Sequence, residues 1–241
     1  MKKLVISGYG KMGKEIEKVA IEKGWKIAAI TDNAADWKSK AADIKTADVI
    51  IDFSMPAAVM DNIERAFELN IPVVVGTTGR HKEISALKQR CETEGKTLIY
   101  ASNFSIGVNI FFEINKKLAE MMNGHHGYEP AIEEIHHTEK LDSPSGTAIT
   151  LAGQIIENLE RKNVFVNHNS NKAEELSIIS KRIAGVPGTH IVNYISEIDE
   201  IEIKHTAKSR RGFAEGAVWA AGKAVKLKGF HYFSDILFNK L

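Results

Sequence analysis

The chain of 241 residues contains a single cysteine, Cys91, so it cannot build an internal disulfide framework. Charge of either sign is not in excess, because 32 Lys and Arg residues balance 31 Asp and Glu residues, and no field pulls the chain towards nucleic acid or a membrane. No apolar run approaches the roughly 18 residues of a membrane span. Met1-Lys2-Lys3 leads directly into a predicted strand, unlike a signal peptide. We therefore expect a cytoplasmic protein with no nucleic-acid or membrane partner.

Short apolar runs alternate with helical patterns over the first hundred residues. The predicted strands are 4–7, 26–30, 49–51, 73–75 and 97–100, and the predicted helices between them are 11–23, 57–69 and 81–94. Strands that are apolar throughout are typical of a parallel sheet covered by helices on both faces. The sequence therefore predicts an α/β protein that begins with a Rossmann-type parallel sheet, in which ligands bind at the carboxyl ends of the strands.

The pattern changes after about residue 107. Helices are predicted at 108–122 and 147–159, a strand at 131–137, three strand-like runs within 177–207 and a mobile polar loop at 163–175. The three runs look antiparallel, because the gaps between them are too short for crossover helices. We predict a domain of residues 1–105 completed by helical segments in 211–241, and a central α+β domain, 106–210, with a mostly antiparallel sheet.

A glycine-rich turn, Gly8-Tyr9-Gly10-Lys11-Met12-Gly13, follows the first strand and opens a helix. Such glycines allow the backbone to approach a pyrophosphate, whose charge then lies at the helix N-terminus. Asp32 ends the second strand, where an acid holds the ribose hydroxyls of a dinucleotide. This combination predicts a nicotinamide dinucleotide site. The alternative interpretation is a structural glycine turn in an unrelated α/β protein.

The segment 134–147 contains His136, His137 and Lys140, and ends in Ser145-Gly146-Thr147 at the start of a helix. Adjacent histidines on a strand point to opposite faces, so they chelate one metal ion poorly, and we expect no metal site. Imidazoles donate protons near neutral pH, and a helix opening of small residues suits a carboxylate. Composition alone leaves solvated loop histidines as an equal alternative.

Two further turns lie at the same predicted edge of the parallel sheet. Gly76-Thr77-Thr78-Gly79 follows the fourth strand, and its amides either face the nicotinamide or only cap a helix. Ala101-Ser102-Asn103-Phe104 follows the fifth strand, and its aromatic ring belongs either to the core or beside the nicotinamide.

These residues together resemble the dihydrodipicolinate reductase family over essentially the full length of the chain. The most specific match is His136-His137-x-x-Lys140-x-Asp142-x-Pro144-Ser145-Gly146-Thr147. Supporting matches are Ile51-Asp52-Phe53-Ser54, Gly76-Thr77-Thr78-Gly79, Asn103-Phe104-Ser105, Gly188-x-His190-x-Val192 and Phe213-Ala214-x-Gly216-Ala217. The resemblance implies an oxidoreductase of lysine and diaminopimelate biosynthesis that reduces 4-hydroxy-tetrahydrodipicolinate, a small dicarboxylate, with loss of water. It also implies a homotetramer formed through the central domains.

The resemblance assigns roles to individual residues. His136 is implied as the catalytic acid and base, Lys140 as a proton donor, and His137, Gly146 and Thr147 as substrate-binding residues. Asp32 is implied to hold the adenosine ribose, and the implied nicotinamide lining is Gly76, Thr78, Ala101 and Phe104, with Thr77, Ser102 and Asn103 beside them.

The cofactor region departs from the family pattern in several places. The glycine loop is one residue tighter than in many members, Asn33 follows Asp32 where an arginine is common, and Met55 occupies a position that is often basic. Because no arginine offsets the repulsion between Asp32 and a 2′-phosphate, we expect NADH to work at least as well as NADPH.

Two other functions fit parts of the pattern. Another two-domain nicotinamide-dependent dehydrogenase would share the glycine loop but not the segment from His136 to Thr147. A non-enzymatic NAD-sensing regulator would need a DNA-binding module, and the sequence contains no basic helix-turn-helix candidate.

Overall fold

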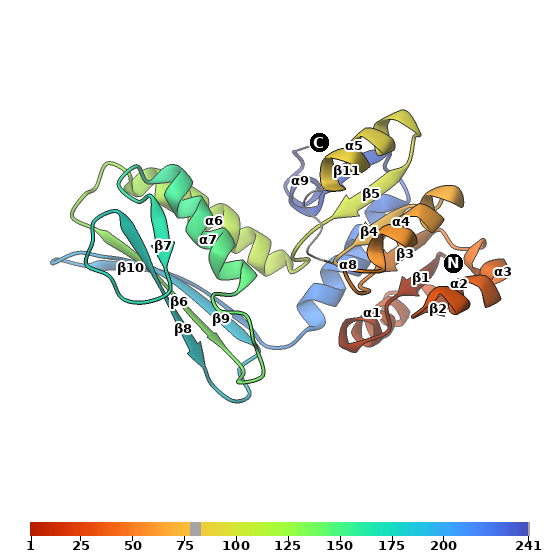
Figure 1. The fold of residues 1–241 in the computed structure, drawn as a ribbon, viewed down its shortest axis with the longest axis horizontal. Coiled ribbons are helices and arrows are strands. Elements are labelled where there is room, and N and C mark those ends of the chain that lie inside the picture. The colour runs from red at the N-terminus through yellow and green to blue at the C-terminus, as the bar shows by residue number, and fades with distance from the viewer. Residues whose placement is uncertain (78–82, 241) are drawn as a thin grey trace. The chain divides into compact units, whose positions relative to one another are not determined.

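The computed structural model describes residues 1–77 and 83–240, and the chain forms two compact units (Figure 1). The first unit comprises Met1–Ile106 and Arg210–Leu241, and the second comprises Gly107–Ser209. Each unit has its own sheet and its own hydrophobic core. The predicted fold class, a parallel sheet with helices followed by an α+β part, is confirmed.

The first unit is built on a six-stranded sheet in the order β11-β5-β4-β3-β1-β2, in which all neighbouring strands are parallel. Its strands are β1 (Lys3–Ser7), β2 (Lys26–Thr31), β3 (Val49–Asp52), β4 (Val73–Val75), β5 (Thr97–Tyr100) and β11 (Gly229–Tyr232). Its helices are α1 (Lys11–Glu22), α2 (Ala34–Ser39), α3 (Ala41–Ile44), α4 (Val59–Glu68), α5 (Ile84–Thr93), α8 (Arg211–Ala224) and α9 (Phe233–Leu237).

Apolar side chains cover both faces of this sheet, as the uninterrupted apolar strands predict. In β1, Leu4 and Ile6 belong to one core, whereas Val5 between them belongs to the core on the other face. The core that contains Leu4 is closed by α1 and α8, and α8 contributes mainly alanines. Such small side chains let a helix approach the sheet closely. A Cβ at Gly216 of α8 would lie 1.7 Å from the Phe104 carbonyl oxygen.

The second unit has a five-stranded mixed sheet in the order β10-β9-β6-β8-β7, and the side of the sheet covered by α6 and α7 carries the core. Strands β9 and β10 are antiparallel neighbours, as expected, while β7 and β8 run parallel to β6. The elements are α6 (Ile106–Met122, starting at the end of the first unit), β6 (Glu129–His136), α7 (Gly146–Asn158), β7 (Val164–Val166), β8 (Glu175–Arg182), β9 (Gly188–Ile195) and β10 (Glu200–Ala207).

Three local expectations are corrected. The segment 163–175 is not wholly a loop, because β7 forms within it and pairs with β8. The C-terminal region is not only helical, since β11 adds an edge strand beside β5. Two short helices, α2 and α3, lie between β2 and β3. All four elements are short, and edge strands such as β7 and β11 need pairing partners that a local pattern does not reveal.

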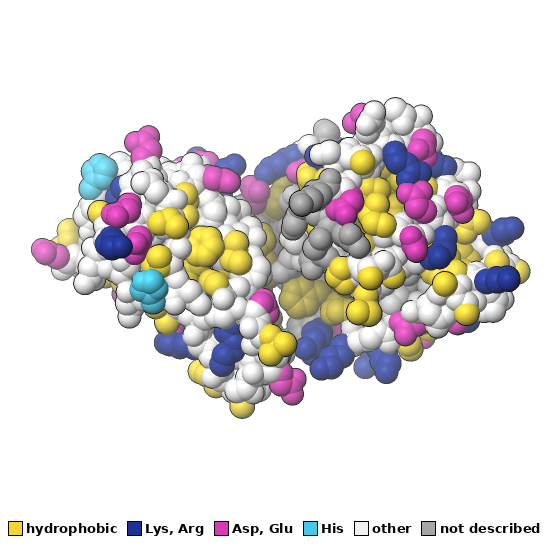
Figure 2. Space-filling model, viewed as in Figure 1, with side chains coloured by type: hydrophobic (Ala, Val, Ile, Leu, Met, Phe, Trp, Pro, Cys, Tyr) yellow, Lys and Arg dark blue, Asp and Glu magenta, His cyan; other side chains and the backbone are white. Residues whose placement is uncertain are grey.

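The surface of the molecule carries charge of both signs. Acidic and basic side chains are mixed over the face of the molecule seen in Figure 2. No helix among residues 1–77 and 83–240 is long and apolar enough to cross a membrane.

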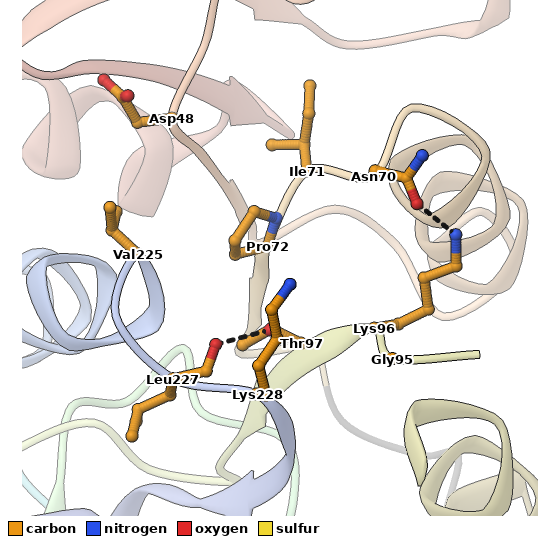
Figure 3. Close-up of a pocket in the computed structure, with 10 residues that line it drawn as sticks. All are labelled: Asp48, Asn70, Ile71, Pro72, Gly95, Lys96, Thr97, Val225, Leu227 and Lys228. Carbon is orange, nitrogen blue, oxygen red and sulfur yellow. Dashed lines mark hydrogen bonds between the residues drawn. The ribbon is translucent and has the colours of Figure 1, made fainter. Parts of the chain in front are cut away.

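A cavity of about 230 Å³ lies near the amino ends of β3, β4 and β5 (Figure 3). Its Lys96 ammonium donates to the Phe67 carbonyl oxygen at 2.7 Å and to Asn70 at 2.5 Å. Ligands of open parallel sheets bind at the opposite edge, so the functional site is sought there.

Candidate functional site

The glycine loop after β1 has the tight geometry that its sequence predicts. Gly8 has a positive φ of 87°, and a Cβ there would lie 2.5 Å from the Phe53 carbonyl oxygen. A Cβ at Gly13 would lie 2.2 Å from the Gly8 carbonyl oxygen. A Cβ at Gly10, in contrast, would meet no protein atom within 4 Å. The outer glycines are therefore required by the fold, whereas Gly10 leaves open space at the N-terminus of α1, as a bound phosphate requires.

Asp32 lies next to this loop at the end of β2. Its Oδ1 accepts a hydrogen bond of 2.8 Å from the Tyr9 N–H, and its side chain is exposed. A second carboxylate follows, because Asp36 Oδ2 accepts from the Asp32 N–H at 2.9 Å. That hydrogen bond, together with the nearby Lys40 ammonium, holds the pKa of Asp36 below its usual value. The end of β2 thus presents two carboxylates, and Lys40 forms an ion pair with that of Asp36 at 3.1 Å.

A buried polar network supports the turn after β4. Asp52, fully buried, accepts hydrogen bonds from the Ser54 hydroxyl, the Asn62 amide and the Thr77 hydroxyl at 2.8 to 2.9 Å. Gly76 lies against the Phe53 ring, where a Cβ would be 2.3 Å away. The Thr77 hydroxyl is therefore bonded to Asp52, and the groups that this turn can offer to a ligand are those of its backbone. Thr78 and Gly79, also predicted to lie here, are outside the described residues.

The turn after β5 separates into exposed and buried residues. Ser102 is exposed, Asn103 is half-buried and accepts from the Ser105 N–H at 2.8 Å, and Ala101 is buried. The Phe104 side chain is only 1% exposed and packs between Phe53 and Phe233, with ring centroids 5.7 and 4.9 Å away. Of the two predicted positions for this ring, the structure shows the core. Phe104 can line a cofactor only through its backbone.

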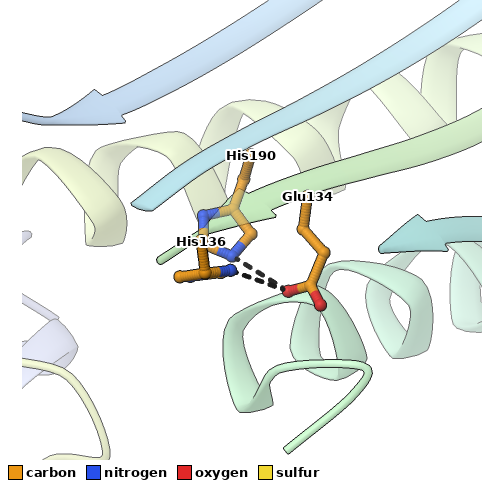
Figure 4. Close-up of side chains that lie close together, drawn as sticks. All are labelled: Glu134, His136 and His190. Carbon is orange, nitrogen blue, oxygen red and sulfur yellow. Dashed lines mark ion pairs between the residues drawn. The ribbon is translucent and has the colours of Figure 1, made fainter. Parts of the chain in front are cut away.

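In the second unit, three titratable side chains meet under the helix-covered face of the sheet (Figure 4). Glu134 and His136 are alternate residues of β6 and point to the same face, and His190 of β9 is the register partner of Glu134. One carboxylate oxygen of Glu134 lies 3.4 Å from His136 Nδ1 and 3.7 Å from His190 Nε2. The two imidazoles are 5.0 Å apart in an edge-on arrangement.

Glu134 is the most connected of the three. Its oxygens accept hydrogen bonds from the Ser145 N–H at 3.1 Å and from the Ser180 hydroxyl at 2.8 Å, and the Arg182 guanidinium lies 3.5 Å away. Burial alone raises the pKa of a carboxyl group, but the hydrogen bonds from Ser145 and Ser180 outweigh it and lower the pKa of Glu134. The buried side chain is therefore an ionised carboxylate.

The two histidines respond to burial in the opposite direction. Burial lowers the pKa of His190 to about 4, so this imidazole is neutral at neutral pH. Burial also lowers the pKa of His136, with Lys140 and Arg182 acting in the same direction and Glu134 opposing them. The Ser145 hydroxyl lies 3.1 Å from His190 Nε2 and connects the cluster to the start of α7.

The ligand atoms of Glu134, His136 and His190 lie within 4.8 Å of one another, a spacing that could hold a divalent cation. In this structure those atoms face other partners, because Glu134 accepts from Ser145 and Ser180, and His190 faces the Ser145 hydroxyl. A hydrogen-bonded network therefore accounts for two members of the cluster without a metal.

The loop after β6 carries the other predicted residues. The Lys140 ammonium contacts both oxygens of Asp142 at 2.8 Å, and the Arg182 guanidinium donates to the Asp142 carbonyl oxygen at 2.6 Å. Partial burial would raise the pKa of Asp142, but the hydrogen bonds and charge of Lys140 keep it below its usual value. His137, on the opposite side of the strand from His136, has a buried Nδ1 without a hydrogen-bond partner among the described residues.

The first turn of α7 follows this loop. Ser145 caps the helix, accepting from the Ala148 N–H at 3.2 Å, and Gly146 and Thr147 are the first helical residues. Gly146 is exposed, and a Cβ there would meet no atom within 4 Å. The first N–H groups of a helix have no intrahelical acceptor and favour an anion. The structure thus brings His136, Lys140, Gly146 and Thr147 into one region around a buried carboxylate.

Sequence reasoning missed the central members of this cluster. Glu134 lies two residues before His136, so strand alternation already places both on one face, and this signal could have identified it. His190 appeared only as part of a supporting motif, and its pairing with Glu134 depends on the sheet register. Ser180 and Arg182 reach the cluster from β8, which no local pattern indicates.

Comparisons with known proteins cover nearly the whole chain. Residues 2–104 match the family described as dihydrodipicolinate reductase, N-terminus, and residues 107–237 match dihydrodipicolinate reductase, C-terminus. A 4-hydroxy-tetrahydrodipicolinate reductase from Christiangramia forsetii is 47% identical over 234 residues, which are 97% of both chains. A protein of the same name from Methanopyrus kandleri is 36% identical and covers 81% of this chain and 73% of its own.

Solved structures agree on the fold. Dipicolinate-bound dihydrodipicolinate reductase from Paenisporosarcina sp. TG-14 superposes with a TM-score of 0.75 at 22% identity, over 98% of this chain and 99% of its own. The diaminopimelate dehydrogenase of C. glutamicum in complex with DAP is more distant, with a TM-score of 0.52 at 13% identity over 97% and 93% of the two chains.

Proposed function

The chain belongs to the dihydrodipicolinate reductase family, and from this premise we propose that it reduces 4-hydroxy-tetrahydrodipicolinate to tetrahydrodipicolinate, with loss of water and at the expense of NAD(P)H. The observation that supports the assignment most directly is the cluster in the second unit. There a buried ionised carboxylate, a histidine and a lysine surround a helix N-terminus suited to a carboxylate substrate.

The first unit would hold the cofactor through its glycine loop, Asp32 and the backbone of the turns after β4 and β5. Two observations fit a dinucleotide: the open space at Gly10, and the exposed Asp32 carboxylate beside the loop. When bound, the nicotinamide supplies the hydride. Asp32 would accept hydrogen bonds from the ribose hydroxyls, and the N-terminus of α1 would stabilise the pyrophosphate charge.

The second unit would bind the dicarboxylate and move the protons. The N–H groups of Gly146 and Thr147, the Thr147 hydroxyl and the His137 imidazole would provide donors for carboxylate oxygens. His136 would donate a proton to the substrate, and the Lys140 cation would stabilise negative charge that develops on the ring. Both lie in the second unit, whereas the cofactor contacts lie in the first.

Cofactor preference follows from the end of β2. The carboxylates of Asp32 and Asp36 repel a 2′-phosphate, and Lys40, which pairs with Asp36, offsets only part of this repulsion. We expect NADH to support turnover at least as well as NADPH. A coupled assay with enzymatically generated substrate tests both the reaction and the preference. A kcat/KM that favours NADPH by more than about tenfold would contradict the preference, and no turnover with either nucleotide would contradict the reaction.

The working form is proposed to be a cytoplasmic homotetramer. Ile135 and Ile179 are half-buried on the sheet face opposite the α6/α7 core, where pairing with another copy would cover them. Light scattering at micromolar protein concentration should give four times the chain mass, and a monomer would reject this assembly.

A further inference from the structure

We propose that Glu134 is the positioning residue of the proton donor: one buried carboxylate lies 3.4 Å from His136 Nδ1, where it pairs with the protonated imidazole, and it also fixes the start of the substrate-binding helix α7. This inference rests on the proposed function, and it assigns a role to a residue outside the predicted site. Glu134 acts through His136 and Ser145 and needs no contact with substrate of its own.

The geometry fixes the carboxylate in place. Glu134 is fully buried, and both of its oxygens receive the Ser145 N–H. The Ser180 hydroxyl binds one oxygen, and His136 Nδ1 faces the other at 3.4 Å. A carboxylate held on two sides cannot rotate away from the imidazole. His136 Nδ1 makes no hydrogen bond among the described residues, so this contact is an ion pair that forms when the ring is protonated. Because Nδ1 is buried against the carboxylate, Nε2 is the nitrogen that can give its proton to a substrate.

The position of Glu134 in the sheet also indicates a role beyond packing. Ser180, Glu134, His190 and His205 are successive register partners across β8, β6, β9 and β10, so they form one polar row on the helix-covered face. The row lies beside an apolar part of the same face, where Ile132, Ile178 and Val192 belong to the core. Burying a carboxylate there is costly unless it is fully hydrogen-bonded, and a site that only packed would be filled by an apolar residue.

The charges around His136 show why the carboxylate matters for proton donation. From the loop after β6, Lys140 disfavours the protonated imidazole and Asp142 favours it; from β8, Arg182 disfavours it. From β9, His190 is neutral because burial lowers its pKa to about 4, and burial also lowers the pKa of its register partner His205 on β10. Removing the charge of Glu134 would leave burial and two cations acting against protonation with Asp142 as the remaining anion.

The test compares Glu134→Gln with the wild type and with Glu157→Gln, which removes one exposed carboxylate from α7 in the same unit. In Glu134→Gln the fall of kcat with rising pH should move to lower pH by about one unit, so kcat on that limb falls about tenfold. Inhibition by dipicolinate should change little, because the glutamine carbonyl oxygen still accepts from the Ser145 N–H. Glu157→Gln should keep the wild-type profile.

Glu134→Asp provides a second variant should Glu134→Gln not fold: its charge is retained but drawn back by one methylene, so the limb should move in the same direction by less. NMR titration of the His136 imidazole in histidine-labelled protein reports the same shift without turnover, so a failure of the proposed reaction stays distinguishable. An unshifted His136 titration in a folded Glu134 variant would overturn the proposal. Wild-type activity that is abolished by EDTA and restored by Zn²⁺ would also overturn it, in favour of a metal site.

Discussion

The two units differ in the groups that they offer to a ligand: the first offers mainly backbone groups, and the second offers side chains. In the first, the predicted ligand contacts are backbone amides at turns together with one side chain, Asp32, and side chains such as Thr77 and Phe104 support those turns from inside. In the second, the predicted contacts are titratable side chains joined around Glu134. A site made from backbone depends on where a Cβ fits. A site made from side chains depends on charge, so the two units should fail differently when changed.

The largest effect is expected where the side chains do the chemistry. His136→Gln or Lys140→Ala should lower kcat by about a hundredfold or more, because each removes a positioned proton donor or cation. NADH affinity, measured by fluorescence titration, should stay close to that of the wild type, since neither residue belongs to the first unit. Near-normal turnover in both variants would show that the chemistry is assigned to the wrong residues.

An intermediate effect is expected in the glycine loop, where space rather than charge decides. Gly13→Ala should destabilise the protein by about 2 kcal/mol, because its Cβ would lie 2.2 Å from the Gly8 carbonyl oxygen. Gly10→Ala, which meets no protein atom, is the matched control and should leave the midpoint of thermal unfolding unchanged. It should nevertheless weaken NADH binding, because the pyrophosphate needs that space. If Gly10→Ala binds NADH normally, the phosphates lie elsewhere.

The smallest effect concerns a single hydrogen bond to substrate. Thr147→Val should weaken dipicolinate binding by about tenfold, which is the loss of one hydrogen bond to a charged group, and should leave NADH affinity unchanged. Calorimetry on NADH-loaded protein measures it. Equal binding of dipicolinate and a monocarboxylate analogue by the wild type would argue against a two-carboxylate site in the second unit.

The two units also differ in how much of their sites could be predicted from the sequence. The glycine spacing and Asp32 predicted the loop geometry of the first unit, because a turn is a local property and few residues adopt a φ of 87°. The strand that carries His136 was also found locally. The register that places His190 opposite Glu134 could not be found, because it joins residues 56 positions apart through strand pairing.

The short elements were missed for a related reason. Strand β11 has four residues, and its pairing with β5 joins Gly229 to Thr97. Phe104 was left between two positions because aromatic residues serve both cores and ligand sites. In the structure its ring packs against Phe233 in the core, and that contact again joins distant parts of the chain.

The first unit is built from two stretches of chain separated by the whole of the second unit. During synthesis, the N-terminal strands therefore emerge long before α8, whose alanines close one of their two cores, and before the edge strand β11. The second unit is continuous and can be completed while its predecessor still exposes the apolar side chains of Leu4, Ile6 and Val49. The unit whose chain is made first is thus the last to receive all of its strands and helices, because its sheet and one of its cores need the residues after Ser209.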